Sequence, residues 1–172
     1  VVVVEGYTDV MACHLAGVTN AVATCGTAFG EDHVKVVRRL MGDTGGGQLK
    51  VGSTGAKVVF TFDGDEAGQN AALKSFALDQ QFLALTYVAV DPDGKDPCDL
   101  RVEGGDAAVT ALLERRVPLF EFVIKTALGA NDLESPEGRA SALRAAAPVV
   151  ARIRDQAIRP EYARRLAGWL GM

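Results

Sequence analysis

The sequence has 172 residues, 48% of them hydrophobic, which suits one globular domain or a domain with an appendage. Its 18 basic and 22 acidic residues give a net charge of −4, so no long-range field attracts nucleic acid. Three cysteines without zinc-type spacing indicate reduced cytosolic thiols. Because there is no signal peptide and no apolar run of about 20 residues, we expect a cytoplasmic protein with no membrane partner.

The first part of the chain alternates strand and helix patterns. Apolar, β-branched runs predict four buried, mainly parallel strands at residues 1–5, 20–25, 57–62 and 82–90. Helices are expected at 9–16, capped by Thr8, at 31–39 and at 65–78. Glycine, serine and threonine between 42 and 56 predict a flexible insertion. The pattern predicts an α/β, Rossmann-like core of about four strands flanked by helices.

The pattern changes near residue 103, after a turn-rich loop at 91–97. No strand signal follows residue 106, and amphipathic helices are expected at 106–116, 119–128, 136–152 and 160–170. Ser135 before Pro136 is a helix cap followed by a first-turn proline. We therefore expect two domains, an α/β domain over residues 1–103 and an all-α subdomain over 104–172.

Acidic residues follow the predicted strands and are the candidate functional residues. They are Glu5, Asp9, Asp63, Asp65 and Asp96. The carboxyl ends of parallel strands meet in one crevice, where two carboxylates about 4 Å apart repel by about 4 kcal/mol at an effective dielectric near 20. Divalent cations relieve this repulsion, and all-oxygen ligands favour Mg²⁺ or Mn²⁺ over Zn²⁺. A pair of such ions supports phosphoryl transfer.

Each candidate also has a plainer interpretation. Asp9 and Asp65 can be first-turn acids that the helix dipole favours, and Asp96 before Pro97 can be a turn residue. Gly26 and Thr27 precede a helix and either cradle a phosphate or form an ordinary turn. Lys35 and Arg38 either contact a nucleic-acid backbone or lie on a solvated helix face.

Four segments in order carry a resemblance to a known family. They are Glu5-Gly6-Tyr7-Thr8-Asp9-Val10, Gly26-Thr27-Ala28, Phe62-Asp63-Gly64-Asp65-Glu66-Ala67-Gly68 and Gly94-Lys95-Asp96-Pro97. Together they resemble the TOPRIM domain of bacterial DnaG-type primases, and the helical tail resembles the subdomain that follows it. The resemblance implies a TOPRIM metal-binding catalytic domain over 1–103 and a helical bundle over 104–172.

The resemblance also implies an activity, DNA-directed synthesis of short RNA primers on single-stranded DNA at replication forks by metal-dependent nucleotidyl transfer. Glu5 then resembles a metal ligand and acid/base group, and Asp63 and Asp65 resemble the metal-binding pair of the catalytic centre. Asp9 and Asp96 resemble further acids of the metal site. The last motif departs from the family pattern, because Cys98 stands where these primases often have aspartate, which puts that ligand in doubt. Asp99 could then replace it after a small shift of the loop.

The implied partners are single-stranded template DNA, ribonucleoside triphosphates, the RNA primer and the replicative helicase. Since the chain opens on a strand without an initiator methionine, we expect a monomeric piece of a larger bacterial protein. The family's zinc-binding amino-terminal domain, with the only zinc, and its helicase-binding carboxyl-terminal domain are expected outside it. We expect this piece alone to bind metal but to be inactive or weakly active.

Three other interpretations stay open. The chain resembles, less closely, other TOPRIM proteins such as type IA topoisomerases and small nucleases. A haloacid-dehalogenase-type phosphatase also places Asp-x-Asp after a strand, but usually has Thr or Val where Ala67 stands, and leaves Glu5 idle. A non-catalytic binding module would leave the acids unexplained.

Overall fold

The computed structural model describes residues 1–42, 56–61, 84–153 and 155–172 and divides the chain into two compact units, Val1–Leu119 and Phe120–Met172. The strands are β1 Val2–Val4, β2 Ala21–Ala23, β3 Lys57–Thr61, β4 Leu85–Ala89 and β5 Val117–Pro118. The helices are α1 Tyr7–Leu15, α2 Glu31–Leu40, α4 Pro97–Glu114, α5 Leu119–Gly129, α6 Pro136–Ala151 and α7 Arg159–Trp169. The helix expected at 65–78 and nearly all of the insertion expected at 42–56 lie outside the described residues.

The strands form one sheet in the order β2-β1-β3-β4-β5. The first four are parallel, as their apolar runs predict, and Val3 of β1 pairs with both Val22 and Phe60. β5 is antiparallel to β4 and contradicts the expectation that no strand follows residue 106. Two residues are too few for a recognisable pattern, although Pro118 favours an extended residue before it.

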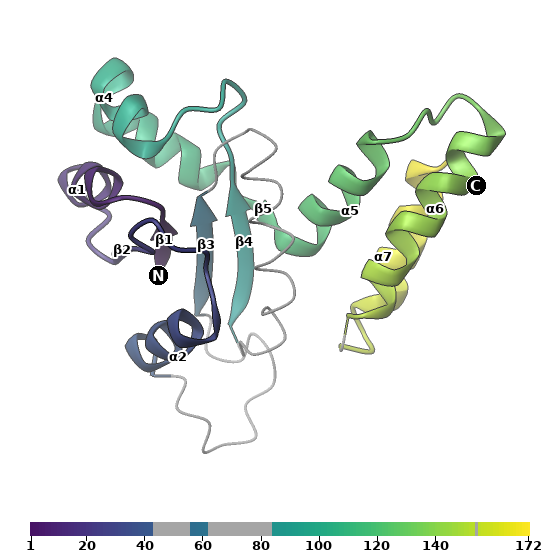
Figure 1. Cartoon of the computed structure of the whole chain (residues 1–172), viewed down its shortest axis with the longest axis horizontal. Coiled ribbons are helices and arrows are strands. Elements are labelled where there is room, and N and C mark those ends of the chain that lie inside the picture. The colour runs from purple at the N-terminus through teal and green to yellow at the C-terminus, as the bar shows by residue number, and fades with distance from the viewer. Residues whose placement is uncertain (43–55, 62–83, 154) are drawn as a thin grey trace. The chain divides into compact units, whose positions relative to one another are not determined.

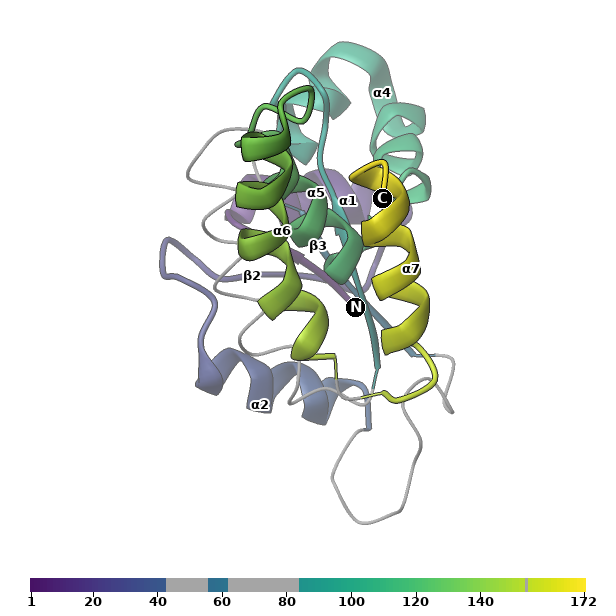
Figure 2. The ribbon, with the colours of Figure 1, turned by 90° about the vertical axis from the view of Figure 1, so that its right-hand side faces the viewer.

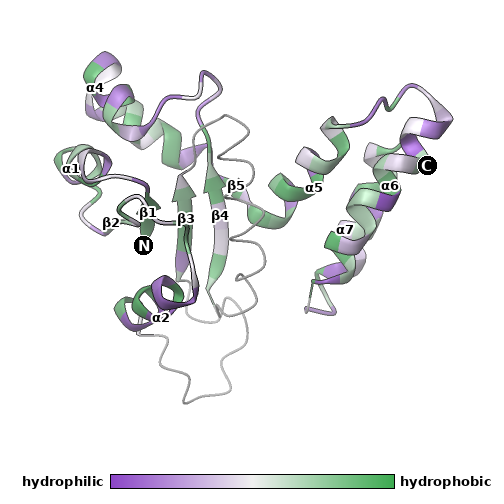
Figure 3. Cartoon of the chain, viewed as in Figure 1, coloured by the Kyte–Doolittle hydropathy of each residue, from purple (hydrophilic) through white to green (hydrophobic). Residues whose placement is uncertain are grey.

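Helices lie on both faces of the sheet (Figures 1 and 3), and alternating side chains of the strands pack in two separate clusters. Val2 and Val4 of β1 pack in one cluster with Cys13 of α1 and Leu112 of α4. The intervening Val3 belongs to a second cluster, with Val34 and Val37 of α2 and Val58 and Phe60 of β3. The first unit therefore has three layers, with α1 and α4 on one face and α2 on the other.

Helix α4 begins nine residues earlier than the helix expected at 106–116. Asp96 caps it, Pro97 is its first residue, and Gly105 (φ 71°) kinks it between two straight halves. Val109 and Leu112 in the second half are buried against the sheet, at 0% and 2% exposure. The boundary expected at residue 103 thus falls inside α4, and the first compact unit extends to Leu119.

The second unit is helical, in agreement with the sequence. Its core contains Ile124 of α5, Ala142 and Ala146 of α6, and Tyr162 and Leu166 of α7. Helices α6 and α7 run side by side (Figure 2), and the Ser135 hydroxyl caps α6 by accepting the Gly138 N–H at 3.1 Å. None of the helices in the described part of the chain is long and apolar enough to span a membrane.

Candidate metal centre

A small cavity of about 10 Å³ opens where β1 and β3 end and α4 begins. This is roughly the space that one water-sized group needs. Three of the five acids expected at the metal site line it, namely Glu5, Asp9 and Asp96. The full lining is Glu5, Asp9, Thr61, Ala89, Lys95, Asp96, Pro97 and Leu112. We call this cavity the acidic crevice.

Glu5 follows β1 directly, and its side chain is exposed. Its backbone carbonyl accepts the N–H of Cys25 at 3.0 Å, which holds the end of β2 beside it. Its side chain lines the crevice from the position directly after β1.

Asp9 lies in the first turn of α1 and is only 5% exposed. Its Oδ2 atom accepts the N–H of Gly6, the residue that caps α1, at 2.9 Å. The cap expected at Thr8 is therefore wrong, because the side chain of Asp9 binds the start of the helix instead. The Oδ1 atom of Asp9 accepts the N–H of Cys98 at 3.3 Å.

Asp96 caps α4, and its Oδ1 atom accepts the N–H of Asp99 at 2.7 Å. It is half-buried, so one side of its carboxylate serves the helix while the residue also lines the crevice. The plainer interpretation of Asp96 as a turn residue thus describes part of its role. Cys98 lies two residues on and is half-buried, with a free thiol.

The other two acids expected at the site, Asp63 and Asp65, lie outside the described residues. Thr61, the last residue of β3, is buried, lines the crevice, and donates its hydroxyl to the carbonyl of Val3 at 3.4 Å. Within the described ranges, no three histidine, cysteine, aspartate or glutamate side chains converge closely enough to hold a metal ion. Glu5, Asp9 and Asp96 therefore share the crevice without forming a complete ligand set by themselves.

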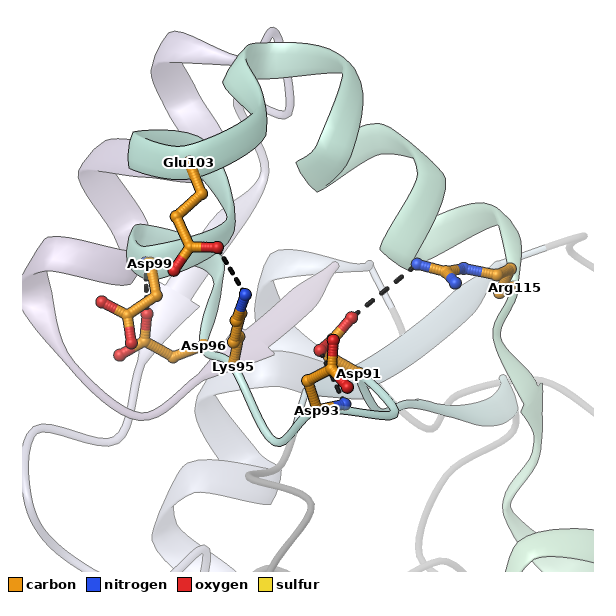
Figure 4. A network of polar contacts seen from close by, with 7 residues as sticks. All are labelled: Asp91, Asp93, Lys95, Asp96, Asp99, Glu103 and Arg115. Atoms are coloured by element: carbon orange, nitrogen blue, oxygen red, sulfur yellow. Dashed lines mark hydrogen bonds and ion pairs between the residues drawn. The ribbon is translucent and has the colours of Figure 1, made fainter.

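Lys95 is the one basic residue among those that line the crevice. It forms an ion pair with Glu103 of α4, and this hydrogen bond raises the pKa of Lys95 (Figure 4). The sequence placed Lys95 in a motif but gave it no role. The signal that could have pointed to it is its position directly before Asp96.

The same loop holds a second polar contact. Asp91 is buried, and its carboxylate accepts the N–H of Asp93 at 3.0 Å and faces Arg115 at 3.8 Å (Figure 4). Its contacts order the chain between β4 and α4, so its role is to shape the loop that carries Lys95 and Asp96.

The residues expected to bind phosphate or nucleic acid lie on another part of the unit. Gly26 (φ 78°) and Thr27 form the turn after β2, where the Thr27 hydroxyl donates to the carbonyl of Thr24 at 2.8 Å. Lys35 and Arg38 lie on α2, and Lys35 pairs with Asp32 at 2.8 Å. None of these four is among the residues that line the crevice.

Burial also changes the pKa of one thiol, that of Cys13. The thiol of Cys13 is fully buried one helical turn beyond Asp9. Its burial, and secondarily the charge of Asp9, raises its pKa to about 11. Cys13 is therefore a neutral core residue at neutral pH.

Two family models match the chain. The Toprim domain model matches residues 1–89, just over half of the chain, and a model described as the DnaB-helicase binding domain of primase matches residues 120–172. The second match corrects the expectation that the family's helicase-binding part is absent from this chain. It coincides with the second compact unit. A Toprim domain in a primase generally implies divalent metal binding.

Relatives and solved structures agree with these models. The DNA primase of Streptomyces coelicolor is 59% identical over 171 residues, which cover 99% of this chain and 25% of that protein. The RNA polymerase domain of Mycobacterium tuberculosis primase DnaG, solved in complex with double-stranded DNA, is 56% identical, with a TM-score of 0.80 over 99% of this chain and 51% of that one. A DnaG primase catalytic domain bound to single-stranded DNA is 30% identical, with a TM-score of 0.76 over 100% of this chain and 51% of that one.

The chain thus spans about a quarter of the length of the curated relatives that it matches and about half of the solved polymerase domains. The resemblance drawn from the four motifs is confirmed at the level of family and fold. The α/β fold with its five-stranded sheet agrees with the Toprim match and with the solved primase domains. We conclude that the chain belongs to the Toprim domain family and that its relatives there are bacterial DNA primases.

Proposed function

We propose that this chain forms the metal-dependent catalytic centre of a DNA primase, a DNA-directed RNA polymerase that synthesises short RNA primers. The observation that carries the proposal is the crevice in which Glu5 and Asp96 lie together at the carboxyl ends of parallel strands in a Toprim fold. The relatives described above are named DNA primases, which favours this activity over the topoisomerase, nuclease and phosphatase interpretations.

The donor set of the crevice suits a hard divalent cation. Glu5, Asp96 and Thr61 offer oxygen atoms, which Mg²⁺ and Mn²⁺ prefer. We propose that Glu5 and Asp96 hold the metal together with Asp63 and Asp65. The resemblance adds Asp9 to this set, but the contacts of Asp9 indicate a different role. Thr61, two residues before Asp63 in the sequence, lines the crevice, which supports a place for this pair there.

The bound metal would activate the attacking hydroxyl and stabilise the charge on the leaving pyrophosphate. We propose that Glu5, which is exposed and lines the crevice, takes the proton of the primer 3′-hydroxyl as its oxygen attacks the α-phosphate. The new O–P bond forms while the bond from the α-phosphate to pyrophosphate breaks. Lys95 can balance charge on the phosphates from the crevice wall.

The partners follow from this activity and from the relatives. Relatives solved with double-stranded and single-stranded DNA support template DNA as a partner, and primer synthesis requires ribonucleoside triphosphates and yields an RNA primer. We assign catalysis to the first unit. Action at the bacterial replication fork, in the cytoplasm, is part of the same proposal.

Binding of Mn²⁺ tests the metal centre. We expect Glu5→Gln to weaken Mn²⁺ binding to this chain at least about tenfold, since it removes a charged ligand. Glu137→Gln, an exposed first-turn acid of α6, is the matched control and should bind Mn²⁺ like the unmodified chain. In an intact primase that carries this sequence, Glu5→Gln should also abolish primer synthesis. Unchanged metal binding and unchanged synthesis in that variant would favour a non-catalytic binding module.

We also infer that the second unit contacts the replicative helicase. The family model that matches residues 120–172 is described by that function. Within this unit an apolar groove of about 500 Å³ lies between α6 and α7, lined in part by Leu143, Ala147, Ala163 and Leu170. An apolar groove on a helical unit suits the apolar face of a partner's amphipathic helix.

Charged substitutions on the groove test the helicase contact. Ala147 and Ala163 are exposed and line the groove, so Ala147→Glu and Ala163→Glu place a charge there without entering the core. Each should weaken helicase binding by an intact primase at least about tenfold if the groove is used. Ala145→Glu, exposed on α6 but away from the groove lining, should not. Equal binding by all three variants would remove the groove from the helicase contact.

A further inference from the structure

One buried carboxylate joins the first turns of two helices that are far apart in the sequence. Asp9, 5% exposed, accepts the Gly6 N–H at 2.9 Å through Oδ2 and the Cys98 N–H at 3.3 Å through Oδ1. Gly6 caps α1, and Cys98 is the second residue of α4, 89 positions from Asp9. Both N–H groups belong to helix ends, where backbone donors lack partners within the helix.

This arrangement stabilises the charge of Asp9 without a cation. The amino-terminal ends of α1 and α4 both present positive partial charge to the carboxylate, and hydrogen bonds to an ionised acceptor are stronger than neutral ones. A carboxylate that only ligated a metal would, in the metal-free protein, lie buried among other acids and oppose folding. Asp9 instead holds two elements together through contacts that need no metal.

The contacts of Asp9 also fix its neighbours in the acidic crevice. Glu5 precedes Gly6 directly, and Asp96 lies two residues before Cys98, so Asp9 holds the backbone within two residues of each acid. The same geometry gives a reason why cysteine is accepted at position 98. Asp9 accepts a hydrogen bond from the backbone N–H of this residue, and every residue type except proline has that N–H.

We propose that Asp9 is a positioning residue that sets Glu5 against Asp96, rather than a ligand of the metal. This inference rests on the proposed function in so far as Glu5 and Asp96 are metal ligands. Its central requirement is geometric, since a carboxylate must reach both N–H groups at once. Charge at position 9 is therefore not sufficient, and a longer acidic side chain should fail as an amide does.

The test compares Asp9→Asn, Asp9→Glu and Glu5→Gln in this chain, by amide hydrogen exchange, thermal unfolding and Mn²⁺ titration. In metal-free protein we expect both Asp9 variants to speed exchange at the Cys98 amide at least tenfold and to lower the melting temperature by several degrees. Glu5→Gln should leave that amide protected and the melting temperature unchanged or higher, because it removes repulsion. Asp9→Glu and Asp9→Asn should weaken Mn²⁺ binding to the same extent.

The opposite pattern would overturn the inference. If Asp9 is a ligand, Asp9→Asn should raise metal-free stability, keep the Cys98 amide protected, and lose Mn²⁺ affinity that Asp9→Glu retains. Should the Asp9 variants fail to fold, amide exchange in the unmodified chain still tests the role of Asp9. The Gly6 and Cys98 amides must be protected without metal and remain so through a Mg²⁺ titration, and exchange at bulk rates without metal refutes the inference. A chain that binds no Mn²⁺ at all would refute the proposed function while leaving these amide results to decide the role of Asp9.

Discussion

At the scale of single residues, one lysine lies among the acids that line the acidic crevice. Lys95 lines it together with Glu5, Asp9 and Asp96 and is held by Glu103 of α4. The hydrogen bond to Glu103 raises the pKa of Lys95, so the side chain is charged at neutral pH. A fixed cation here reduces repulsion among the acids, and under the proposed function it would oppose the binding of a divalent cation in the crevice.

We therefore predict that Lys95→Met tightens Mn²⁺ binding. Removing a unit positive charge near a divalent cation is worth on the order of 1 kcal/mol, or about fivefold in the dissociation constant, at water-like dielectric. Lys35→Met, which also removes an ion-paired lysine but on α2, should leave the dissociation constant unchanged. Calorimetric titration at low ionic strength measures both variants. Weaker binding in Lys95→Met would show that Lys95 supports the metal site instead of opposing it.

The buried thiol of Cys13 should make the free energy of unfolding decrease at alkaline pH. Its pKa lies near 11 in the folded chain against an ordinary value of 9.0, mainly because burial disfavours the thiolate. The folded state therefore keeps a proton that the unfolded state loses, and the associated stability is present below pH 9 and disappears as the pH rises through 11. The loss amounts to about 2–3 kcal/mol.

Denaturant unfolding between pH 8 and pH 11 tests this expectation. Cys13→Ala should unfold with a smaller decrease in free energy over this range, whatever its stability at pH 8. Cys25→Ser, at an exposed cysteine, should keep the decrease of the unmodified chain. Identical slopes in all three proteins would mean that groups other than Cys13 cause the decrease at alkaline pH.

At the scale of secondary-structure elements, the sequence predicts those elements that have a regular residue pattern. Four parallel strands and the helices at 31–40, 119–129, 136–151 and 159–169 follow from β-branched runs, apolar stripes and caps such as Ser135. The elements that the sequence did not predict, the first half of α4 and strand β5, each depend on only a few residues. Asp96-Pro97 suits a turn and a helix start equally well, which concealed the first half of α4, and the two residues of β5 are extended only beside β4.

The acidic crevice divides in the same way. Acids that follow strands form a pattern in the sequence, which predicts Glu5 and Asp96 as site residues, and both line the crevice. The contact between Asp9 and the N–H of residue 98 has no sequence signature, because the donor is backbone and lies 89 positions away. Lys95 was overlooked because its partner Glu103 is on a helix whose start was placed too late.

The loop before α6 approaches its helix so closely that only glycine fits at position 138. A Cβ atom there would lie 1.8 Å from the Asp132 carbonyl oxygen and 2.8 Å from the Ser135 hydroxyl oxygen. Gly138→Ala should therefore displace the loop, break the cap of α6 and cost about 2–4 kcal/mol. Gly168→Ala in α7 meets no atom within 4 Å and should instead add up to about 1 kcal/mol. The fluorescence of Trp169, the sole tryptophan, follows the unfolding of this unit, and equal stability of the two variants would contradict the contact.

At the scale of the whole molecule, each compact unit has a core of its own. The buried clusters on the two faces of the sheet contain residues from the first unit only, and the cluster formed by α5, α6 and α7 contains residues from the second only. This separation matches the two family models, one over the sheet and one over the helices. The proposed roles divide accordingly, with metal chemistry in the first unit and the helicase contact in the second.

Charge at this scale bears on what the chain does alone. With 18 basic and 22 acidic residues it carries a net charge of −4, whereas affinity for nucleic acid comes mainly from lysine and arginine contacts that release counterions. Lys35 also forms an ion pair with Asp32, and Lys95 forms one with Glu103. A chain with the proposed metal ligands and a net negative charge should bind the cation far better than the template.

We therefore predict that this 172-residue chain binds Mn²⁺ but holds single-stranded DNA only weakly and synthesises no detectable primer. Fluorescence anisotropy with a labelled oligonucleotide should show a dissociation constant of about 10⁻⁴ M or weaker at physiological salt, at the weak end of the range of non-specific binding. Lys35→Glu should change it little, because Lys35 is already paired. Primer synthesis at the level of an intact primase, or micromolar DNA binding that falls steeply with salt, would show that local basic groups on this chain suffice to hold the template despite its net charge.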